Sequence, residues 1–311
     1  MTKKKETMEF RFYEVPQKEP LLALLGESWN RVYGHDETRQ HFHNLMEIGY
    51  CHNGAGTLVL NEERCNYCSS MFSVIPANYP HITVSDGEEA NYWEYLFFDL
   101  KSIVSEFYPD NLIQQQKMLD LVQQKAVLLP EAEYPSLAAI IRGIMEEMRK
   151  KKQHYIQFVR ILMKALFIEL MRMHDQIADM ELEPAAPFNV SQISAALSYI
   201  DLHYAKNIKV SELAAVCSMS ETHFRRLFEE YTNMPPMDYV NLIRIQRACE
   251  LMKKTNDSMD MIAAKCGFFT TSTFNRNFKK FLDTSPYQWK INPENYERKL
   301  LNYHISAMKG W

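Results

Sequence analysis

Three histidines and one glutamate in the N-terminal half of the chain could bind a metal ion. His41 and His43 come shortly before Glu47, and His81 follows farther along the chain. Neutral imidazoles together with a carboxylate suit iron, manganese or zinc. The same side chains could instead fix the hydroxyl groups of a small polar molecule. Both kinds of chemistry require the fold to bring the four residues together.

Two aromatic residues, Tyr92 and Trp93, could complete a pocket for such a molecule. Polyol rings stack well on aromatic rings, and ligand pockets combine apolar walls with a few polar groups. The alternative is that both residues only pack inside the fold. The candidate ligand-binding residues are His41, His43, Glu47, His81, Tyr92 and Trp93.

Short β-strands are expected to position these side chains. Segments 46–50, 56–60, 71–75 and 92–98 are rich in strand-forming residues, and turn-forming residues such as Asn53-Gly54 separate them. Short strands at this spacing predict a small antiparallel β-barrel. The candidate ligand-binding residues would lie near its mouth.

Two motifs in this region resemble those of cupins, in which two His, a Glu and a later His bind a metal. They read His41-x-His43-x3-Glu47-x6-Gly54 and Pro76-x-Asn78-x2-His81. The resemblance implies a cupin-like barrel. It also leaves a metal-dependent cupin enzyme as one alternative for this half of the chain.

A different chemistry is suggested by a pattern that occurs twice in the C-terminal third. The segment 213–217 returns as 262–266, and the segment 220–228 returns as 270–278, at offsets of 49 and 50 residues. Such a repeat indicates one supersecondary unit built twice. Each unit is predicted to be a helix, a short turn and a second helix.

The second helix of each copy has one apolar face and one face that can form hydrogen bonds. Ser220 and Thr270 are the predicted N-caps of these helices. The apolar residues are Phe224, Leu227 and Phe228 in the first copy, and Phe274 and Phe278 in the second. The opposite face carries Thr222, Arg225 and Arg226, matched by Ser272, Asn275 and Arg276. Arg can bind guanine and Asn can bind adenine in a DNA major groove, so both helices are candidate recognition helices.

Residues 191–292 resemble the double helix-turn-helix domain of AraC/XylS-type transcription regulators. The matching signatures are Ala214, Phe228, Ile243-Arg244-Ile245-Gln246-Arg247-Ala248, Ile262-Ala263, Cys266-Gly267-Phe268, Phe274, Phe278-Lys279-Lys280 and Ser285-Pro286. The chain has Asn233 and Asp283 where this family usually has Gly, just past a helix. Those positions often need a left-handed backbone, which Asn and Asp tolerate best among the other residues.

The resemblance implies a sequence-specific regulator of transcription. Most such proteins are activators, often of carbohydrate-utilisation genes, and sugars are a common class of effector. AraC-type sensor domains commonly keep the cupin residues without a metal role, which favours a protein that is not an enzyme and needs no cofactor or metal. Two alternatives remain: a virulence or stress regulator with a non-sugar ligand or none, and a metal-dependent cupin enzyme fused to a DNA-binding domain.

The candidate DNA contacts follow from the same two helices. Residues 238–253 should form one helix that fixes the recognition helices relative to each other, so that they enter successive major grooves. Lys279 and Lys280 are expected to help with phosphate. The base-reading residues are Thr222, Arg225 and Arg226 in one groove, and Thr271, Ser272, Asn275 and Arg276 in the next.

Residues 101–180 change to a helical period. One apolar stripe runs from Leu137 to Met148, and a second set of apolar residues alternates three and four apart from Ile156 to Ile177, as in a coiled-coil seam. The seam could pack inside its own domain or against a second copy of the chain. The family resemblance favours a homodimer, so we expect a helical dimerisation segment here.

Composition is consistent with two domains and with DNA binding at the C-terminal end. The net charge of the 311-residue chain is −4, but residues 191–290 contain 13 Lys and Arg against 10 Asp and Glu, a net of +3 that leaves −7 elsewhere. The sequence has no run of 18 apolar residues and no leader-like N-terminus. Its six cysteines fit reduced thiols. Together these features predict a cytoplasmic protein without a membrane partner. The expected domains are an arm and barrel (1–100), the helical segment (101–180), a linker (181–190), the DNA-binding domain (191–292) and a tail (293–311).

Overall fold

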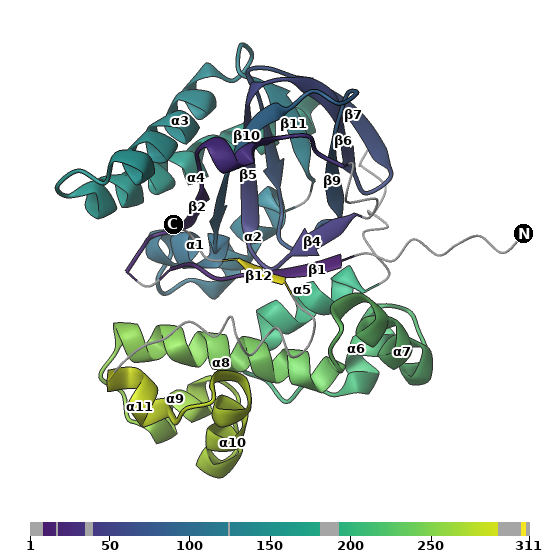
Figure 1. Cartoon of the computed structure of the whole chain (residues 1–311). Coiled ribbons are helices and arrows are strands. Elements are labelled where there is room, and N and C mark those ends of the chain that lie inside the picture. The colour runs from purple at the N-terminus through teal and green to yellow at the C-terminus, as the bar shows by residue number, and fades with distance from the viewer. Residues whose placement is uncertain are drawn as a thin grey trace, which may run out of the picture. The chain divides into compact units, whose positions relative to one another are not determined.

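The computed structural model describes residues 9–16, 18–34, 40–123, 125–180, 193–291 and 306–308. These residues form two compact units (Figure 1). The first contains the described residues between 13 and 180. The second contains those from 193 to 308, together with residues 9–12. The predicted linker and most of the C-terminal tail lie outside the described residues.

The first unit is built on two facing antiparallel sheets. One sheet includes, in spatial order, β4 (His41–His43), β9 (His81–Ser85), β6 (Ala55–Leu60) and β7 (Glu63–Cys68). The other has the order β11 (Val127–Pro130), β8 (Met71–Ile75), β5 (Met46–Asn53), β10 (Asn91–Phe98) and β2 (Leu22–Leu24), with β3 (Asn30–Arg31) also paired to β10. Rings from opposite sheets meet between them, as Tyr67 and Trp93 do at a centroid distance of 4.9 Å.

The predicted antiparallel β-fold is confirmed, and it takes the form of two sheets rather than a closed barrel. The four predicted strands correspond to β5, β6, β8 and β10. Gly54 has φ of 116°, a backbone conformation that glycine adopts without strain. A Cβ at this position would also collide with the Asn91 side chain, at 2.3 Å. Within the predicted arm and barrel, the apolar residues 21–25 contain the edge strand β2, whose Leu22 pairs with Phe97.

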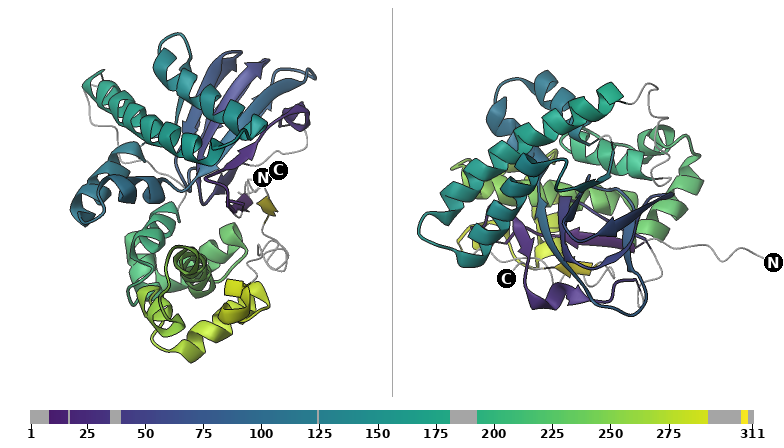
Figure 2. Two further views of the ribbon diagram at one scale, coloured as in Figure 1. Left: turned by 90° about the vertical axis from the view of Figure 1, so that its left-hand side faces the viewer. Right: turned by 90° about the horizontal axis from the view of Figure 1, so that it is seen from above.

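Four helices cover the outer face of the second sheet (Figure 2). They are α1 (Leu100–Phe107), α2 (Leu112–Val122), α3 (Pro135–Lys150) and α4 (Tyr155–Met180). The stripe predicted from Leu137 to Met148 lies on α3 and is buried against strand residues such as Ile48 and Leu96. No helix among the described residues is long and apolar enough to span a membrane.

The apolar seam predicted for residues 156–177 lies on α4 and packs inside its own unit. Val159, Met163, Leu166, Leu170 and Met173 are all buried in the core shared with α3 and the sheet. Of the two alternatives for this seam, the structure supports packing within the domain. A dimer of this protein therefore needs a different surface, because these side chains are already covered.

The second unit is helical and contains two helix-turn-helix motifs. It comprises α5 (Ser194–His203), α6 (Val210–Val216), α7 (Glu221–Thr232), α8 (Pro236–Lys254), α9 (Met259–Lys265), α10 (Thr271–Leu282) and α11 (Pro286–Ile291). The pairs α6/α7 and α9/α10 are the two predicted copies, and α8 is the predicted connecting helix. β1 (Glu9–Tyr13) and β12 (Ser306–Met308) are neighbouring strands of one sheet. The first unit also contains a short 3₁₀ helix (Glu27–Trp29).

Two arginines of the family signature hold α8 against the end of α5. Arg244 is buried and donates from Nε to the carbonyl of Tyr204 and from Nη2 to that of Lys206, both at 2.8 Å. Arg247 forms an ion pair with Asp201 at 3.1 Å. Arg244 therefore satisfies the Tyr204 carbonyl at the end of α5, which has no partner inside that helix, and both arginines stabilise the scaffold of the recognition helices.

Candidate DNA-binding face and histidine cluster

The first recognition helix, α7, presents its predicted polar face to solvent. Ser220 caps the helix by accepting a hydrogen bond from the His223 amide at 3.4 Å. The apolar residues predicted to face inward, Phe224, Leu227 and Phe228, are buried. Thr222, Arg225 and Arg226 are exposed. The structure thus brings the three candidate base-reading residues of this copy together on one accessible surface.

The second recognition helix, α10, repeats this arrangement. Thr270 caps it by accepting from the Thr273 amide at 3.2 Å, and Phe274 and Phe278 are buried. Its predicted contact residues Ser272, Asn275 and Arg276 are exposed, and Thr271 is half-buried. The Thr271 hydroxyl donates to Asp260 of α9, which ties this contact residue to the first helix of its own motif.

Acidic side chains pair with cations of both helices, which sequence reasoning did not foresee. Arg225 pairs with Glu221 at 2.6 Å and Arg226 approaches Glu230 at 3.7 Å, while Lys279 is exposed. Lys280 pairs with Asp238 at 2.8 Å. Exposed pairs of this kind contribute about 0–1 kcal/mol, so these cations can exchange their carboxylate partners for phosphate or base edges.

The four cupin-type residues form one buried cluster in the first unit. Their ligand atoms all lie within 4.8 Å of one another, although they come from the strands β4, β5 and β9. His43 Nε2 lies 3.0 Å from Glu47 Oε2, and His81 Nε2 lies 3.4 Å from the same oxygen. The rings of His41 and His81 are 4.3 Å apart.

Backbone carbonyls orient two of the histidines. His43 donates from Nδ1 to the Leu45 carbonyl at 2.8 Å, and His81 donates from Nδ1 to the Tyr79 carbonyl at 2.9 Å. The turn that precedes His81 is fixed by Asn78, which has φ of 62° and donates its backbone N–H to the His43 carbonyl at 2.7 Å. Two separate strands are therefore locked in the register that aims both imidazoles at Glu47.

Burial and mutual contact set the charges of the cluster. Burial alone would raise the pKa of Glu47, but the neighbouring His81 and His43 lower it to about 2, so this carboxyl is ionised. Burial lowers the pKa of His43, which favours its neutral form. The rings of Tyr13 and Phe97 lie against His43 at 5.1 and 5.2 Å and shield it from water.

The two candidate aromatic residues lie on opposite faces of β10. Trp93 is buried between the sheets and stacks on Tyr95, which in turn stacks on Phe97 beside His43. Tyr92 points the other way and stacks on His52 at 4.7 Å. Successive side chains of a strand alternate between faces, so Trp93 shares the interior with the histidine cluster and Tyr92 does not.

A buried carboxylate on that other face was not predicted. Glu94 accepts hydrogen bonds from the Gly26 amide, His52, Tyr92 and Arg149, at distances from 2.6 to 2.8 Å. Burial would raise its pKa, but the hydrogen bonds from His52 and Arg149 lower it to about 2. Arg149 lies at the end of α3, far away in sequence, so no local pattern could have indicated this pairing.

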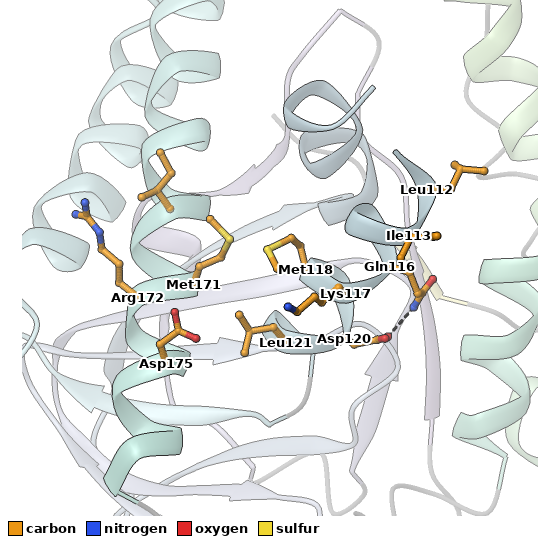
Figure 3. Close-up of a pocket in the computed structure, with 11 residues that line it drawn as sticks. Leu112, Ile113, Gln116, Lys117, Met118, Asp120, Leu121, Met171, Arg172 and Asp175 are labelled. Carbon is orange, nitrogen blue, oxygen red and sulfur yellow. Dashed lines mark hydrogen bonds between the residues drawn. The ribbon is translucent and has the colours of Figure 1, made fainter. Parts of the chain in front are cut away.

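A groove between α2 and α4 exposes apolar side chains on the surface of the first unit (Figure 3). Its volume is about 1060 Å³. Leu112 and Ile113 at one end are 77% and 85% exposed, which is unusual for large apolar residues. Charged side chains of both signs also line the groove, namely Lys117, Asp120, Arg172 and Asp175.

Two family models match this chain, and together they span both units. Residues 30–171 match the AraC-like ligand binding domain, and residues 213–291 match a helix-turn-helix domain. The first match includes the histidine cluster, and the second includes α7 and α10 completely. Each unit therefore corresponds to a recognised module, in the order that the sequence analysis predicts.

Individual related proteins share low sequence identity with this chain. The chain is similar to the HTH-type transcriptional activator RhaS of Klebsiella pneumoniae (25% identity; 51% of this chain and 60% of RhaS are covered) and to the HTH-type transcriptional regulator AlkR of Acinetobacter baylyi (30%; 42% of each). The match thus spans less than two thirds of each of these curated relatives. Among solved structures, apo ToxT from Vibrio cholerae aligns with 14% identity and a TM-score of 0.36, covering 87% of this chain and 95% of ToxT.

Proposed function

The chain belongs to the AraC family of transcription regulators, and on that premise we propose that it is an effector-responsive activator that reads promoter DNA with α7 and α10. The observation that carries this proposal is the matched pair of capped helices, each with a buried aromatic back and an exposed polar front. Two such helices joined by one continuous helix suit successive major grooves on one face of DNA.

We assign base reading to the exposed fronts of the two helices. Arg225 and Arg226 on α7, and Asn275 and Arg276 on α10, have the side chains that recognise guanine and adenine edges. Thr222, Thr271 and Ser272 lie near the helix N-termini, where the first turn of a recognition helix meets DNA. Lys279 and Lys280 are assigned to phosphate, with Lys280 having to leave Asp238.

The effector site in this proposal lies between the two sheets of the first unit. The interior there combines the ionised Glu47 and its histidines with the row formed by Trp93, Tyr95 and Phe97. Polar groups beside aromatic faces suit a sugar or another small polar molecule. A regulator with a non-sugar ligand remains the second candidate, because the same groups would accept other polar effectors.

Activation and homodimerisation are further parts of the proposal. The similarity to a relative named as a transcriptional activator supports activation, which implies contact with RNA polymerase.

For the dimer, we assign the groove between α2 and α4 to a second copy of this chain. Its exposed Leu112 and Ile113 need a cover, and its cations and carboxylates can pair with their own copies across a two-fold axis.

Binding of the full-length protein to its own upstream intergenic DNA tests this function. The titration is done at moderate salt, with and without a panel of mono- and oligosaccharides. We expect specific binding that at least one compound shifts severalfold. Specific binding that no sugar shifts would keep the regulator and reject sugar sensing, and equal binding to scrambled DNA in every condition would overturn the proposal.

A further inference from the structure

We propose that Phe269 is a further specificity-determining residue, which recognises the 5-methyl group of a thymine in the major groove entered by α10. Its side chain lies in the turn between α9 and α10 and is 80% exposed, more than any other large apolar side chain among the described residues of the helical unit. The inference rests on the function proposed above, because it adds one contact to the same recognition helix.

The turns of the two helix-turn-helix motifs begin in the same way. Ser218 and Gly267 both have a left-handed backbone, with φ of 54° and 82°. The residues that follow them, Met219 and Phe268, donate their backbone N–H groups at 2.9 and 3.0 Å to the carbonyls of equivalent alanines in α6 and α9. Met219 and Phe268 are therefore counterparts in the two copies.

The turns differ by one residue, which comes directly after these counterparts. In the first copy Met219 is followed by the N-cap Ser220. In the second copy Phe269 lies between Phe268 and the N-cap Thr270. This additional residue is the reason that the offset between the copies changes from 49 to 50 residues. Phe269 thus has no counterpart in the first motif.

The fold does not use the side chain of this additional residue. The residue just before an N-cap often packs on the fourth residue of the helix, which in α10 is Phe274. Here Phe268 takes that place, because it is buried and its ring lies 5.4 Å from that of Phe274. The ring of Phe269 is left in water, so a partner that covers it would gain the free energy of burying an apolar surface.

Neighbouring contacts fix Phe269 at the N-terminal end of α10. Thr270 accepts a hydrogen bond from the Thr273 amide at 3.2 Å. The hydroxyl of Thr271, a proposed base-reading residue, donates to Asp260 of α9. The N-terminal residues of a recognition helix are those that contact base edges. Phe269 comes only two residues before Thr271, so it lies at the end of the helix that meets DNA.

The chemistry of the major groove determines what an apolar ring can recognise there. Base edges in this groove carry hydrogen-bond donors and acceptors, and the 5-methyl group of thymine is their apolar group. A phenyl ring gains by covering this methyl group, and it loses where it strips water from a polar edge without replacing the hydrogen bond. Phe269 should therefore favour thymine at one position of the half-site bound by α10.

The test uses full-length protein and a specific duplex that this protein selects from a random DNA library. Each thymine of the duplex is replaced in turn by deoxyuridine, which removes only the methyl group. With the unchanged protein, we expect one replacement to weaken binding about 4-fold, as the loss of one buried methyl group would. With Phe269→Ala, binding to the original duplex should be about 10-fold weaker, and the same replacement should have no further effect.

Three further variants assign the contact. Phe269→Leu keeps an apolar side chain and should retain the preference for the methyl group. Ile291→Ala changes a residue of α11 that is 69% exposed, and it should bind as the unchanged protein does. Arg276→Ala relaxes the preference at one base position and thereby identifies the half-site of α10, in which the sensitive thymine should lie. Phe269→Ala should keep the Tm of the unchanged protein, because its side chain is already in water.

The inference is overturned if no deoxyuridine replacement weakens binding by the unchanged protein, or if every such effect persists in Phe269→Ala. It is also overturned if Phe269→Ala weakens binding to all sequences equally, which would mark a contact with sugar and phosphate. In each of these cases, specific binding by the unchanged protein would leave the proposed regulator standing. A protein that selects no specific duplex would overturn both.

Discussion

Asn233 and Asp283 occupy the same left-handed conformation at equivalent ends of the two recognition helices, with φ of 54° and 56°. The amide of each donates at 2.9 Å to the helix, to the carbonyls of Glu229 and Lys279 respectively. The sequence pattern predicted this conformation from the family's usual glycines, and the structure confirms it. The repeat thus extends to single backbone angles, which are strained for both residues.

Replacing either residue by glycine should therefore stabilise the DNA-binding unit. Asn233→Gly and Asp283→Gly each remove the Cβ that disfavours this conformation, and we expect a gain of about 0.5 kcal/mol, because greater freedom of the unfolded chain offsets part of the relief. Urea unfolding measures the change. Asn275→Gly, at an exposed position inside α10, should instead destabilise by roughly 0.5 kcal/mol. Equal losses at all three positions would contradict the strain at the helix ends.

Single arginine substitutions should separate base reading from phosphate contact. Arg226→Ala or Arg276→Ala is expected to cost roughly 1–3 kcal/mol on the specific site and to relax the preference at one base position. Lys279→Ala should weaken binding to all sequences about equally and reduce the salt slope by about 1. Fluorescence anisotropy with a set of singly mutated sites measures both. A uniform loss for the arginines would reassign them to phosphate.

Removing an acidic partner on the front of α7 should strengthen DNA binding. Glu221→Gln frees Arg225 from its ion pair and deletes a negative charge on the proposed DNA-binding surface. We expect severalfold tighter binding at low salt and a steeper loss as salt rises, because one more cation can displace counterions. Glu169→Gln, on α4 of the other unit, is the control and should leave both quantities unchanged. Weaker binding would mean that Glu221 positions Arg225 for recognition.

The helical unit could be predicted because its sequence signals lie close to the features that they determine. The N-caps Ser220 and Thr270, the apolar faces and the spacing of two copies all lie within a few residues of the feature that they predict. In the first unit, the strong strands β5, β6, β8 and β10 had enough apolar residues to be recognised. The strand β7 is polar and lies at a sheet edge, and β4 has three residues, so neither has a distinct pattern.

The features that the sequence did not predict depend on contacts between residues that lie far apart in the chain. Whether Trp93 or Tyr92 faces the histidines depends on the register of β10 against β5, where Phe97 pairs with Glu47. A shift of one residue would exchange the two faces. The contact of Arg149 with Glu94 likewise depends on how α3 packs on the sheet. By contrast, the apolar face of α4 was predicted correctly from its periodicity. Periodicity alone could not show that this face packs against the interior of its own unit.

The buried carboxyl of Glu94 should make the ligand-binding unit sensitive to acid. Its pKa falls from 4.5 to about 2 on folding, so the folded state gains stability above about pH 4.5 and loses it as the pH falls toward 2. We expect a loss of about 1–2 kcal/mol over that window, less than the full shift implies because Arg149 is 41% exposed and solvent screens the pair.

Glu94→Gln tests this dependence, because it keeps the size of the side chain and removes the titrating group. Unfolding in urea at pH 3 and pH 6 should show a smaller difference for the variant than for the unchanged protein. Glu146→Gln is the matched control, since Glu146 also pairs with Arg149 but lies on the surface. A pH dependence that Glu94→Gln leaves intact would place the acid sensitivity elsewhere.

The proposed dimer surface can be tested without disturbing the core. Leu112→Asp together with Ile113→Asp places charges at two positions that are already 77% and 85% exposed, so Tm measured at low protein concentration should change little. We expect the unchanged protein to sediment as a dimer and this variant to shift toward monomer, because a buried interface cannot accommodate unpaired carboxylates. Phe158→Asp, on α4 outside the groove, is the control and should remain dimeric. A dimer that survives in the double variant and dissociates in the control would move the interface to the other exposed face of α4.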